Sequence, residues 1–123
     1  MPRQAGATIS SRDYLLALAE RERLKQAYTA ATAGVDAVLT PTTVTPAIPV
    51  NSIDQNTTPA MFTRWVNFLD LCAIAVPNGM TAGGLPISLQ IVCAPYQESL
   101  ALRIGWAYQT ATDWQDRVPG MVL

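Results

Sequence analysis

The sequence has 123 residues, of which 50% are hydrophobic and 14% charged, with a formal net charge of −1 at neutral pH. This length fits a single domain with its own core, so we expect one domain over residues 1–123. The charge balance, without any basic block, argues against nucleic acid as a ligand. The longest apolar runs fall short of the roughly 18 residues of a membrane-spanning segment.

The first predicted element is a helix over residues 10–34, "SSRDYLLALAERERLKQAYTAATAG". Ser10 or Ser11 can cap its start, and Ser10 with Asp13 makes a loose capping box. Gly34 is suited to end the helix. An apolar stripe follows helical spacing; its members are Tyr14, Ala17, Leu24, Tyr28 and Ala31.

A short apolar run, "VDAVLTP" at residues 35–41, predicts a strand buried on both faces. The next segment, 41–59, contains four prolines together with many Thr and Asn residues, and so predicts a loop. Loops of this length in compact domains are often functional or wrap a partner.

The second half of the chain predicts a helix around 59–71, a buried strand "CAIAVP" at 72–77, and a turn "NGMTAGG". A strand "LPISLQIV" at 85–92 and a final helix from 98 to 114 follow. Apolar residues define one face on each helix; they are Met61, Trp65, Phe68 and Leu69 on the first, and Leu100, Ile104, Ala107, Tyr108 and Ala111 on the second.

Together these elements predict an α/β fold, in which a mixed or mostly parallel sheet of about three strands packs with three helices. Cys72 and Cys93 lie inside apolar runs, and we expect them to be buried free thiols. With no His in the chain and only these two cysteines, we expect no metal site, since a structural site needs about four ligands.

The pieces "VDAVLTPTTVTPA" and "FTRWVNFLDLCAIAVPNGMTAGGLPISLQIV", followed by "ESLALRIGWAYQ", resemble the C-terminal third of the amidase signature family. The resemblance rests on the order and spacing of these motifs together, and it spans roughly residues 10–117. The matching residues are Asp36, Leu39, Pro41, Thr42, Asn67, Ala73, Pro77, Gly79, Gly84, Leu85, Pro86, Gln90, Glu98, Leu100, Arg103 and Tyr108. The resemblance implies that the chain has a fragment of the amidase fold and no cofactor.

This sequence departs from the family pattern in two places. The family often has Gly-Leu-Pro where this chain has Asp70-Leu71-Cys72, and the stretch "NFLDLCAIAVPNG" is more similar to allophanate hydrolase amidase domains. A glycine or a basic residue is common in the family around Cys93 and Ala94. These departures leave the substrate of the parent enzyme open.

The resemblance also implies a Ser–Ser–Lys catalytic arrangement, which lies in the N-terminal two thirds of the family. No "GSSGG"-like stretch occurs in this chain. Its adjacent serines are Ser10 and Ser11, and its one lysine is Lys25. On one helix, Ser11 and Lys25 would be about 21 Å apart at about 1.5 Å per residue, too far for proton transfer. We therefore expect no catalytic residue in this chain.

By the resemblance, Thr63, Arg64 and Asn67 border the substrate pocket of the complete enzyme. The alternative is that Asn67 binds a loop backbone and Arg64 is solvated. Three hypotheses for the chain stay open: an amidase segment that is inactive alone, a self-associating structural module, and one half of a split amidase. We expect a homodimer or a missing N-terminal amidase half as partner, and a cytoplasmic location.

Overall fold

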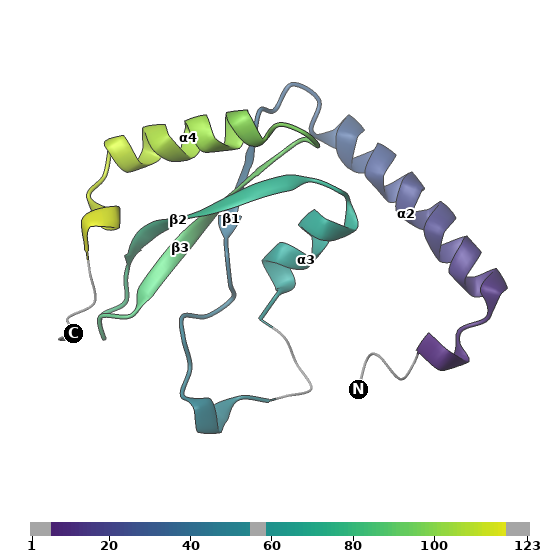
Figure 1. Ribbon diagram of the computed structural model, residues 1–123, viewed down its shortest axis with the longest axis horizontal. Helices are drawn as coiled ribbons and strands as arrows, with labels where there is room; N and C mark the ends of the chain where they lie inside the picture. The colour runs from purple at the N-terminus through teal and green to yellow at the C-terminus, as the bar shows by residue number, and fades with distance from the viewer. Residues whose placement is uncertain (1–5, 55–58, 118–123) are drawn as a thin grey trace. The chain divides into compact units, whose positions relative to one another are not determined.

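The computed structural model describes residues 6–54 and 59–117 of the chain. They fall into two compact units, residues 1–35 and residues 36–123, which are taken in turn below. Figure 1 shows the chain in colours that run from the N-terminus to the C-terminus. No helix in the described ranges combines the length and apolar character needed to cross a bilayer.

The first unit contains the helix α2, Ser11–Ala31, after a 3-10 turn at Gly6–Thr8. The predicted capping box is confirmed: the Ser10 hydroxyl oxygen accepts the Asp13 N–H at 3.1 Å and donates to the Asp13 carboxylate at 2.6 Å. The helix ends at Thr32, earlier than the expected Gly34. Gly34 instead lies in the turn beyond the helix, with φ +81°, where a residue without Cβ is favoured.

The predicted apolar stripe of α2 is not a buried face within the described structure. No residue of α2 is buried, and Tyr14 and Leu24 are both exposed. Helical spacing places apolar residues on one side of a helix, but only a packing partner buries them. The stripe therefore remains a surface of this unit.

The second unit is built on a sheet with the order β1-β3-β2, formed by β1 (Val38–Pro41), β2 (Cys72–Met80) and β3 (Pro86–Cys93). Both pairings are antiparallel. The expectation of a mixed or mostly parallel sheet is thus corrected, while the α/β class is confirmed. The reason is the short connection between β2 and β3, since parallel neighbours need a long crossover.

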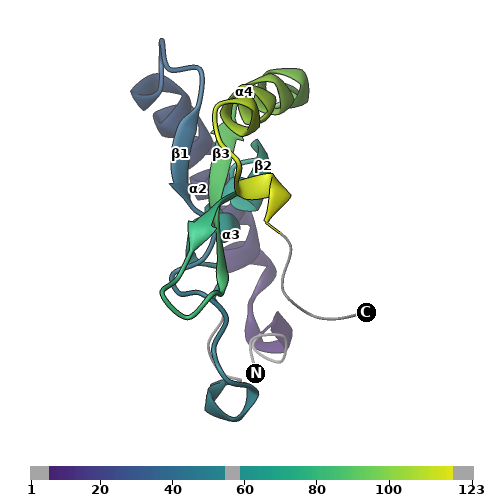
Figure 2. The same ribbon diagram turned by 90° about the vertical axis from the view of Figure 1, so that its left-hand side faces the viewer.

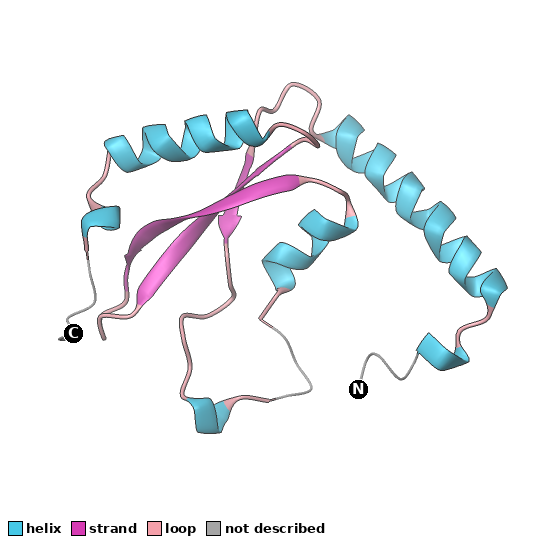
Figure 3. Ribbon diagram, viewed as in Figure 1, coloured by secondary structure: helices cyan, strands magenta, loops and turns pink. Residues whose placement is uncertain are grey.

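The turn between β2 and β3 is tighter than the sequence suggests, because β2 runs on through Asn78 and Gly79 to Met80. The Thr81 N–H donates to Leu85 O at 2.8 Å, and the Thr81 hydroxyl oxygen accepts the Leu85 N–H at 3.0 Å. Gly84 has φ +76° in this turn. A β-bulge between Pro77 and Gly79 accommodates the extra residue. Figure 3 shows the hairpin in magenta.

The strands β1 and β2 are also more exposed than predicted. Both lie at edges of the described sheet and alternate between half-buried and exposed residues over much of their length. The central strand β3 is buried on both faces in its second half, where Gln90 and Ile91 face opposite sides. The position of a strand in the centre of the sheet, and not its apolar composition, decides whether both of its faces are buried.

The helix α3, Met61–Phe68, follows the long 42–60 connection, which contains a 3-10 turn at Val50–Ser52. Its buried residue is Val66, whereas Met61 and Phe68 of the predicted face are exposed. The chain leaves the helix through Asp70, which has φ 57°. A left-handed residue after a helix is usually glycine, and Asp is among the residues that tolerate it. This explains why the family's glycine can be replaced here by Asp70.

The helix α4, Glu98–Thr110, covers one face of the sheet (Figure 1). The core beneath it consists of Val76, Ile91, Cys93 and Ala101. Leu100, Ile104 and Tyr108 pack against this core as predicted. Ala107 and Ala111 are exposed, so the predicted face was two residues too wide. Figure 2, turned by 90°, shows α4 lying along the sheet.

Gly105 is the point at which α4 comes closest to the sheet. A Cβ built on Gly105 would lie 2.3 Å from Ile74 Cδ1 and 3.4 Å from Val76 Cγ1. Real Cβ atoms do not approach other carbons to 2.3 Å, so the side chain of Ile74 occupies the space that an alanine would need. An alanine at this position would therefore require Cδ1, the terminal atom of the Ile74 side chain, to move.

We predict that Gly105→Ala destabilises the chain by about 1–3 kcal/mol, because overpacking outweighs the gain in helix propensity. Urea denaturation measures the effect. In an Ile74→Val background, which removes the clashing Cδ1 atom, the same substitution should be neutral or stabilising. An equal cost of Gly105→Ala in both backgrounds would show that Ile74 does not set the contact.

Candidate functional site

Gln90 joins three elements from the centre of the sheet. Its side chain is 4% exposed. Its Nε2 donates to the Phe62 carbonyl oxygen of α3 at 2.7 Å and to the Thr40 hydroxyl oxygen of β1 at 3.0 Å. An apolar side chain could not make these bonds, and buried amides are found where their hydrogen bonds are satisfied. Gln90 thus fixes α3 on the sheet face opposite α4.

Polar side chains continue along this face. Thr40 pairs with Gln90 in the register of β1 and β3, and the Thr42 N–H donates to Ser88 O at 3.2 Å just beyond. Alternation along β3 places Ser88 on the same side as Gln90, and Thr42 follows the end of β1 opposite Ser88. The Thr42 hydroxyl oxygen is buried without a hydrogen-bond partner among the described residues. We call Thr40, Thr42, Ser88 and Gln90 the polar face.

The sequence-predicted pocket residues lie on α3, beside this polar face. Thr63 is half-buried, and its hydroxyl lies 3.5 Å from Ala60 O, at the limit of a hydrogen bond. Arg64 and Asn67 are exposed. Thr63 and Asn67 are one helical turn apart and so share one side of α3. The structure therefore groups Thr63 with Asn67 and leaves both available to a ligand from outside the described unit.

A cavity of about 310 Å³ opens beside the sheet, between the end of β1 and the start of β3. Its lining combines apolar strand residues with threonines of the following loop: Leu39, Thr40, Pro41, Thr43, Val44, Thr45, Pro46, Asn78, Ile87, Ser88 and Leu89. Thr63, Arg64 and Asn67 do not line it. The predicted pocket residues and this cavity are therefore separate features of the unit.

Asn78 of β2, which lines the cavity, accepts a hydrogen bond at its side-chain oxygen from the hydroxyl of Tyr108 on α4. The bulge in β2 is what turns Asn78 toward α4. Tyr108 also packs against the core with its ring. This contact anchors the last turns of α4 to the hairpin and holds one wall of the cavity.

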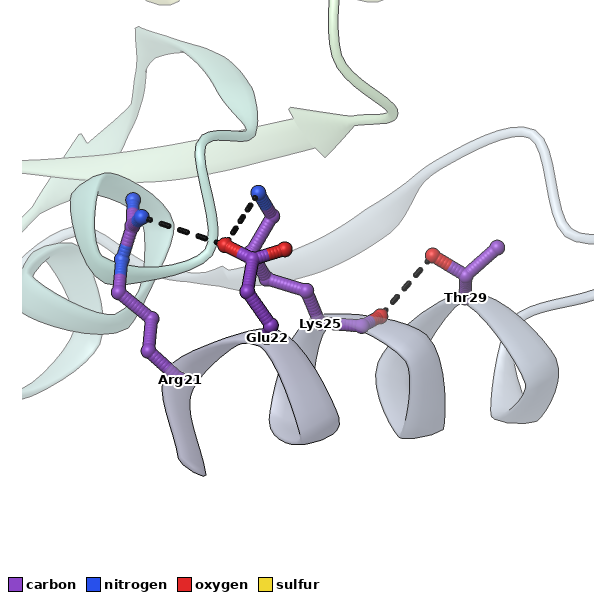
Figure 4. Close-up of polar contacts among 4 residues, drawn as sticks. All are labelled: Arg21, Glu22, Lys25 and Thr29. Atoms are coloured by element: carbon purple, nitrogen blue, oxygen red, sulfur yellow. Dashed lines mark hydrogen bonds and ion pairs between the residues drawn. The ribbon is translucent and has the colours of Figure 1, made fainter. Parts of the chain in front are cut away.

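Ser10, Ser11 and Lys25 do not form a catalytic group within the first unit. Ser10 is the N-cap of α2, and Ser11 begins the same helix that carries Lys25. The Lys25 ammonium lies 3.1 Å from the Glu22 carboxylate, which Arg21 also approaches at 3.7 Å. Figure 4 shows these contacts along one side of α2. Because Ser11 and Lys25 are fourteen positions apart on one helix, they stay about 21 Å apart.

The role of Gln90 was missed by sequence reasoning, which named it as one of the residues that match the family pattern. The signal was present in "ISLQIVC", where a lone amide precedes three apolar residues. A strand covered on both faces must satisfy any polar side chain internally. In such a strand, Gln90 could have been assigned a hydrogen-bonding role before the structure was known.

Comparison with known proteins places these features in one family. A family model described as Amidase matches residues 2–102. The chain is 36% identical over 114 residues to a glutamyl-tRNA(Gln) amidotransferase subunit from Geobacter metallireducens, and 38% identical over 109 residues to its counterpart from Synechococcus sp. strain JA-2-3B'a(2-13). These alignments cover 88% and 86% of this chain.

Solved structures agree with the sequence comparison. A crystal structure of an amidase superposes with a TM-score of 0.79 at 27% identity, covering 88% of this chain and 27% of that one. A glutamyl-tRNA(Gln) amidotransferase subunit from Thermotoga maritima superposes with a TM-score of 0.74 at 26% identity, covering 81% and 23%. The chain belongs to the amidase family. It spans about a fifth to a quarter of the length of the curated relatives it matches, 23% and 21% for the two above.

We predict that Gln90→Leu lowers the free energy of unfolding by about 1–3 kcal/mol, because Phe62 O and Thr40 Oγ1 lose a buried donor. Chemical denaturation of the purified variant measures this. Gln97→Leu is the matched control, since Gln97 is exposed and its side chain makes no capping bond, and its effect should stay within about 0.5 kcal/mol. Equal stability of wild type and Gln90→Leu would contradict the assigned role.

Proposed function

We propose that this chain is the C-terminal segment of an amidase and is not catalytic by itself. The parent enzyme would hydrolyse the C–N bond of a carboxamide, without a metal or an organic cofactor. The observation that carries the proposal is the family match over residues 2–102, combined with a span of only 21–23% of the two relatives' lengths. The enzyme would work in the cytoplasm.

The chemistry of the chain supports its being inactive alone. Amide hydrolysis by a serine nucleophile needs a base within hydrogen-bond reach of the hydroxyl. Lys25, the one lysine of the sequence, is bonded to Glu22 and is far from Ser11 on the same helix. With no histidine in the chain, the described residues offer no alternative pairing of a serine with a neutral base.

Within the parent, we assign Thr63, Arg64 and Asn67 to the lining of the substrate pocket. The exposure of Arg64 and Asn67 supports this assignment, as does the half-buried position of Thr63 next to Phe62, which Gln90 binds. The remaining amidase region, supplied by the same polypeptide or by a separate one, would bring the nucleophile to them. Gln90 would then act as a positioning residue, because it holds the first turn of α3 against the sheet.

We predict that the isolated chain releases no ammonia from a panel of small carboxamides and allophanate above the buffer rate. A coupled ammonia assay on purified chain provides the measurement. Ser11→Ala should change nothing, because Ser11 only begins a helix. Turnover by the wild-type chain that disappears in Ser11→Ala would refute the proposal.

Exchange of segments between proteins tests whether this chain can serve as the C-terminal segment of an active amidase. In a chimera, this chain would replace the matched region of the Geobacter metallireducens relative. The chimera should hydrolyse carboxamides, and Asn67→Ala within it should lower kcat/KM. A folded chimera without turnover, beside an active unmodified relative, would show that this segment does not complete an amidase.

A second candidate function is a self-associating structural module. The observation that favours it is an exposed apolar pair on the outer side of α4: Leu102 is 61% exposed and Trp106 is 69% exposed, one turn apart. The described sheet also has two open edges, β1 and β2. Exposed apolar pairs and open strand edges both recruit partners, and a two-fold dimer is the commonest closed solution.

If this second function holds, the chain should be a dimer at tens of micromolar in light scattering. Replacing both Leu102 and Trp106 by Asp should then shift it to monomer while the circular dichroism stays unchanged. The control is Ser99→Asp, an exposed position on the same helix, which should leave the dimer intact. A monomeric wild-type chain would rule out self-association and favour the missing amidase region as the partner.

A further inference from the structure

The two cysteines of the chain are direct partners across the β2–β3 pair. Cys72 is the first residue of β2, Cys93 is the last residue of β3, and the register places them opposite one another. Both sulfurs belong to the cluster under α4, in which Cys93 is a core residue and Cys72 packs against it. Twenty-one positions of sequence separate them, which is why the sequence alone did not suggest the pair.

The hydrogen-bonding pattern defines the kind of pair they form. The Thr42 N–H donates to Ser88 O, so the backbone groups of Ser88 point toward β1. Because these groups alternate along a strand, those of Cys93 point toward β2, and Cys72 and Cys93 form a hydrogen-bonded antiparallel pair. Such pairs have Cα atoms about 5.5 Å apart, inside the range of about 4.4–6.8 Å that a disulfide spans.

The two thiols differ in access. Cys93 is buried, and this burial, with smaller contributions from the neighbouring Cys72 and Asp36, raises the pKa of its thiol. Cys72 is half-buried, and its sulfur lies 3.2 Å from the Ala94 carbonyl oxygen, to which it donates. An oxidant from solution therefore reaches Cys72 first, and Cys93 is placed to react second. Both are free thiols in this structure.

We propose that Cys72 and Cys93 form a reversible thiol–disulfide site that responds to peroxide. The Cys72 thiolate attacks one oxygen of hydrogen peroxide, the O–O bond breaks, and Cys72 becomes a sulfenic acid with release of hydroxide. The Cys93 sulfur then attacks the Cys72 sulfur, the S–S bond forms, and the S–O bond breaks. Two thiols and one peroxide give one disulfide and two waters.

Geometry makes the proposed bond easy to reduce. Cβ atoms in a hydrogen-bonded pair are about 5.5 Å apart, whereas a disulfide brings them to about 3.8 Å. The two strand ends must therefore move together, and a bond under such strain has the more oxidising potential typical of regulatory disulfides. Both cysteines lie at strand ends, where the backbone can move more easily than inside the sheet.

Oxidation would act on the connection between β3 and α4. The Cys72 thiol proton now bonds Ala94 O, and a disulfide has no proton to donate. Two residues further along, Tyr96 has φ 62°, a conformation that side chains rarely adopt. Loss of the bond to Ala94 would loosen this turn, which leads directly into α4.

The test is mild oxidation of the full 123-residue chain with hydrogen peroxide, followed by intact mass measurement and peptide mapping without reductant. We expect the mass to fall by two hydrogens, and a cross-linked peptide pair to contain Cys72 and Cys93. Reduced glutathione should restore both thiols. Hydrogen–deuterium exchange should increase in residues 94–98 of the oxidised chain compared with the reduced chain.

Two single variants complete the design, each checked by circular dichroism. In Cys93→Ser, peroxide should leave a sulfenic acid on Cys72 that dimedone traps, and in Cys72→Ser, Cys93 should resist oxidation. If Cys93→Ser fails to fold, the Cys72→Ser variant and the mass of the oxidised wild-type chain still test the proposal. The proposal is overturned if the folded wild-type chain gains oxygen atoms or forms only intermolecular disulfides, with no intramolecular Cys72–Cys93 peptide pair.

Discussion

The close approach of α4 to β2 at Gly105 is the constraint on which the second unit depends. The Ile74 side chain fills the space beside Gly105, so helix and strand meet here with no side chain of the helix between them. This contact brings Leu100 and Ile104 onto the core and carries Tyr108 to Asn78. Because packed interiors lack spare volume, a shift of α4 here would propagate to the cysteine pair beneath its first turns and to the wall of the cavity.

The opposite face of the sheet adds a polar contact to its buried apolar residues, Val66 of α3 and Val92 of β3. Small and polar residues of the sheet face α3 there. The side-chain amide of Gln90 links the sheet to α3 by hydrogen bonds. Hydrogen bonds fix direction more strictly than apolar contacts do. The orientation of Thr63 and Asn67 on α3 therefore follows from that of Phe62.

The sequence predicted the local features of the fold better than the way in which its elements pair. The capping box at Ser10, the strand 86–93 and the packing of Ile104 all follow from short-range patterns, and the structure has each of them. The antiparallel sheet, the extended β2 and the exposed stripe of α2 do not follow, because apolar runs record burial but not strand direction or the identity of the packing partner. The family was predictable because its motifs are spread in order along the chain.

For the candidate site, the sequence indicated which residues could line a pocket but not which residues contact one another in the fold. The amidase resemblance singled out Thr63, Arg64 and Asn67, and these remain proposals. Gln90 pairs with Thr40, which lies 50 positions earlier in the sequence, and Cys93 pairs with Cys72, which lies 21 positions earlier. Both pairs depend on the register of the sheet. No local pattern encodes these registers. The turn at 81–85 and the bulge at Pro77–Gly79 set the pairing of β2 with β3, and β1 pairs with β3 across the long connection.

The place of β1 in the sheet has a kinetic consequence. The pairing of β2 with β3 closes a short turn, but the pairing of Thr40 with Gln90 closes a loop of 50 residues that includes the proline-rich connection. Closing a longer loop costs more chain entropy and slows folding. The hairpin and α4 can therefore assemble first, with β1 joining last. In the native protein, β1 would be the first strand to detach, and its amide hydrogens would exchange with solvent ahead of those of β2.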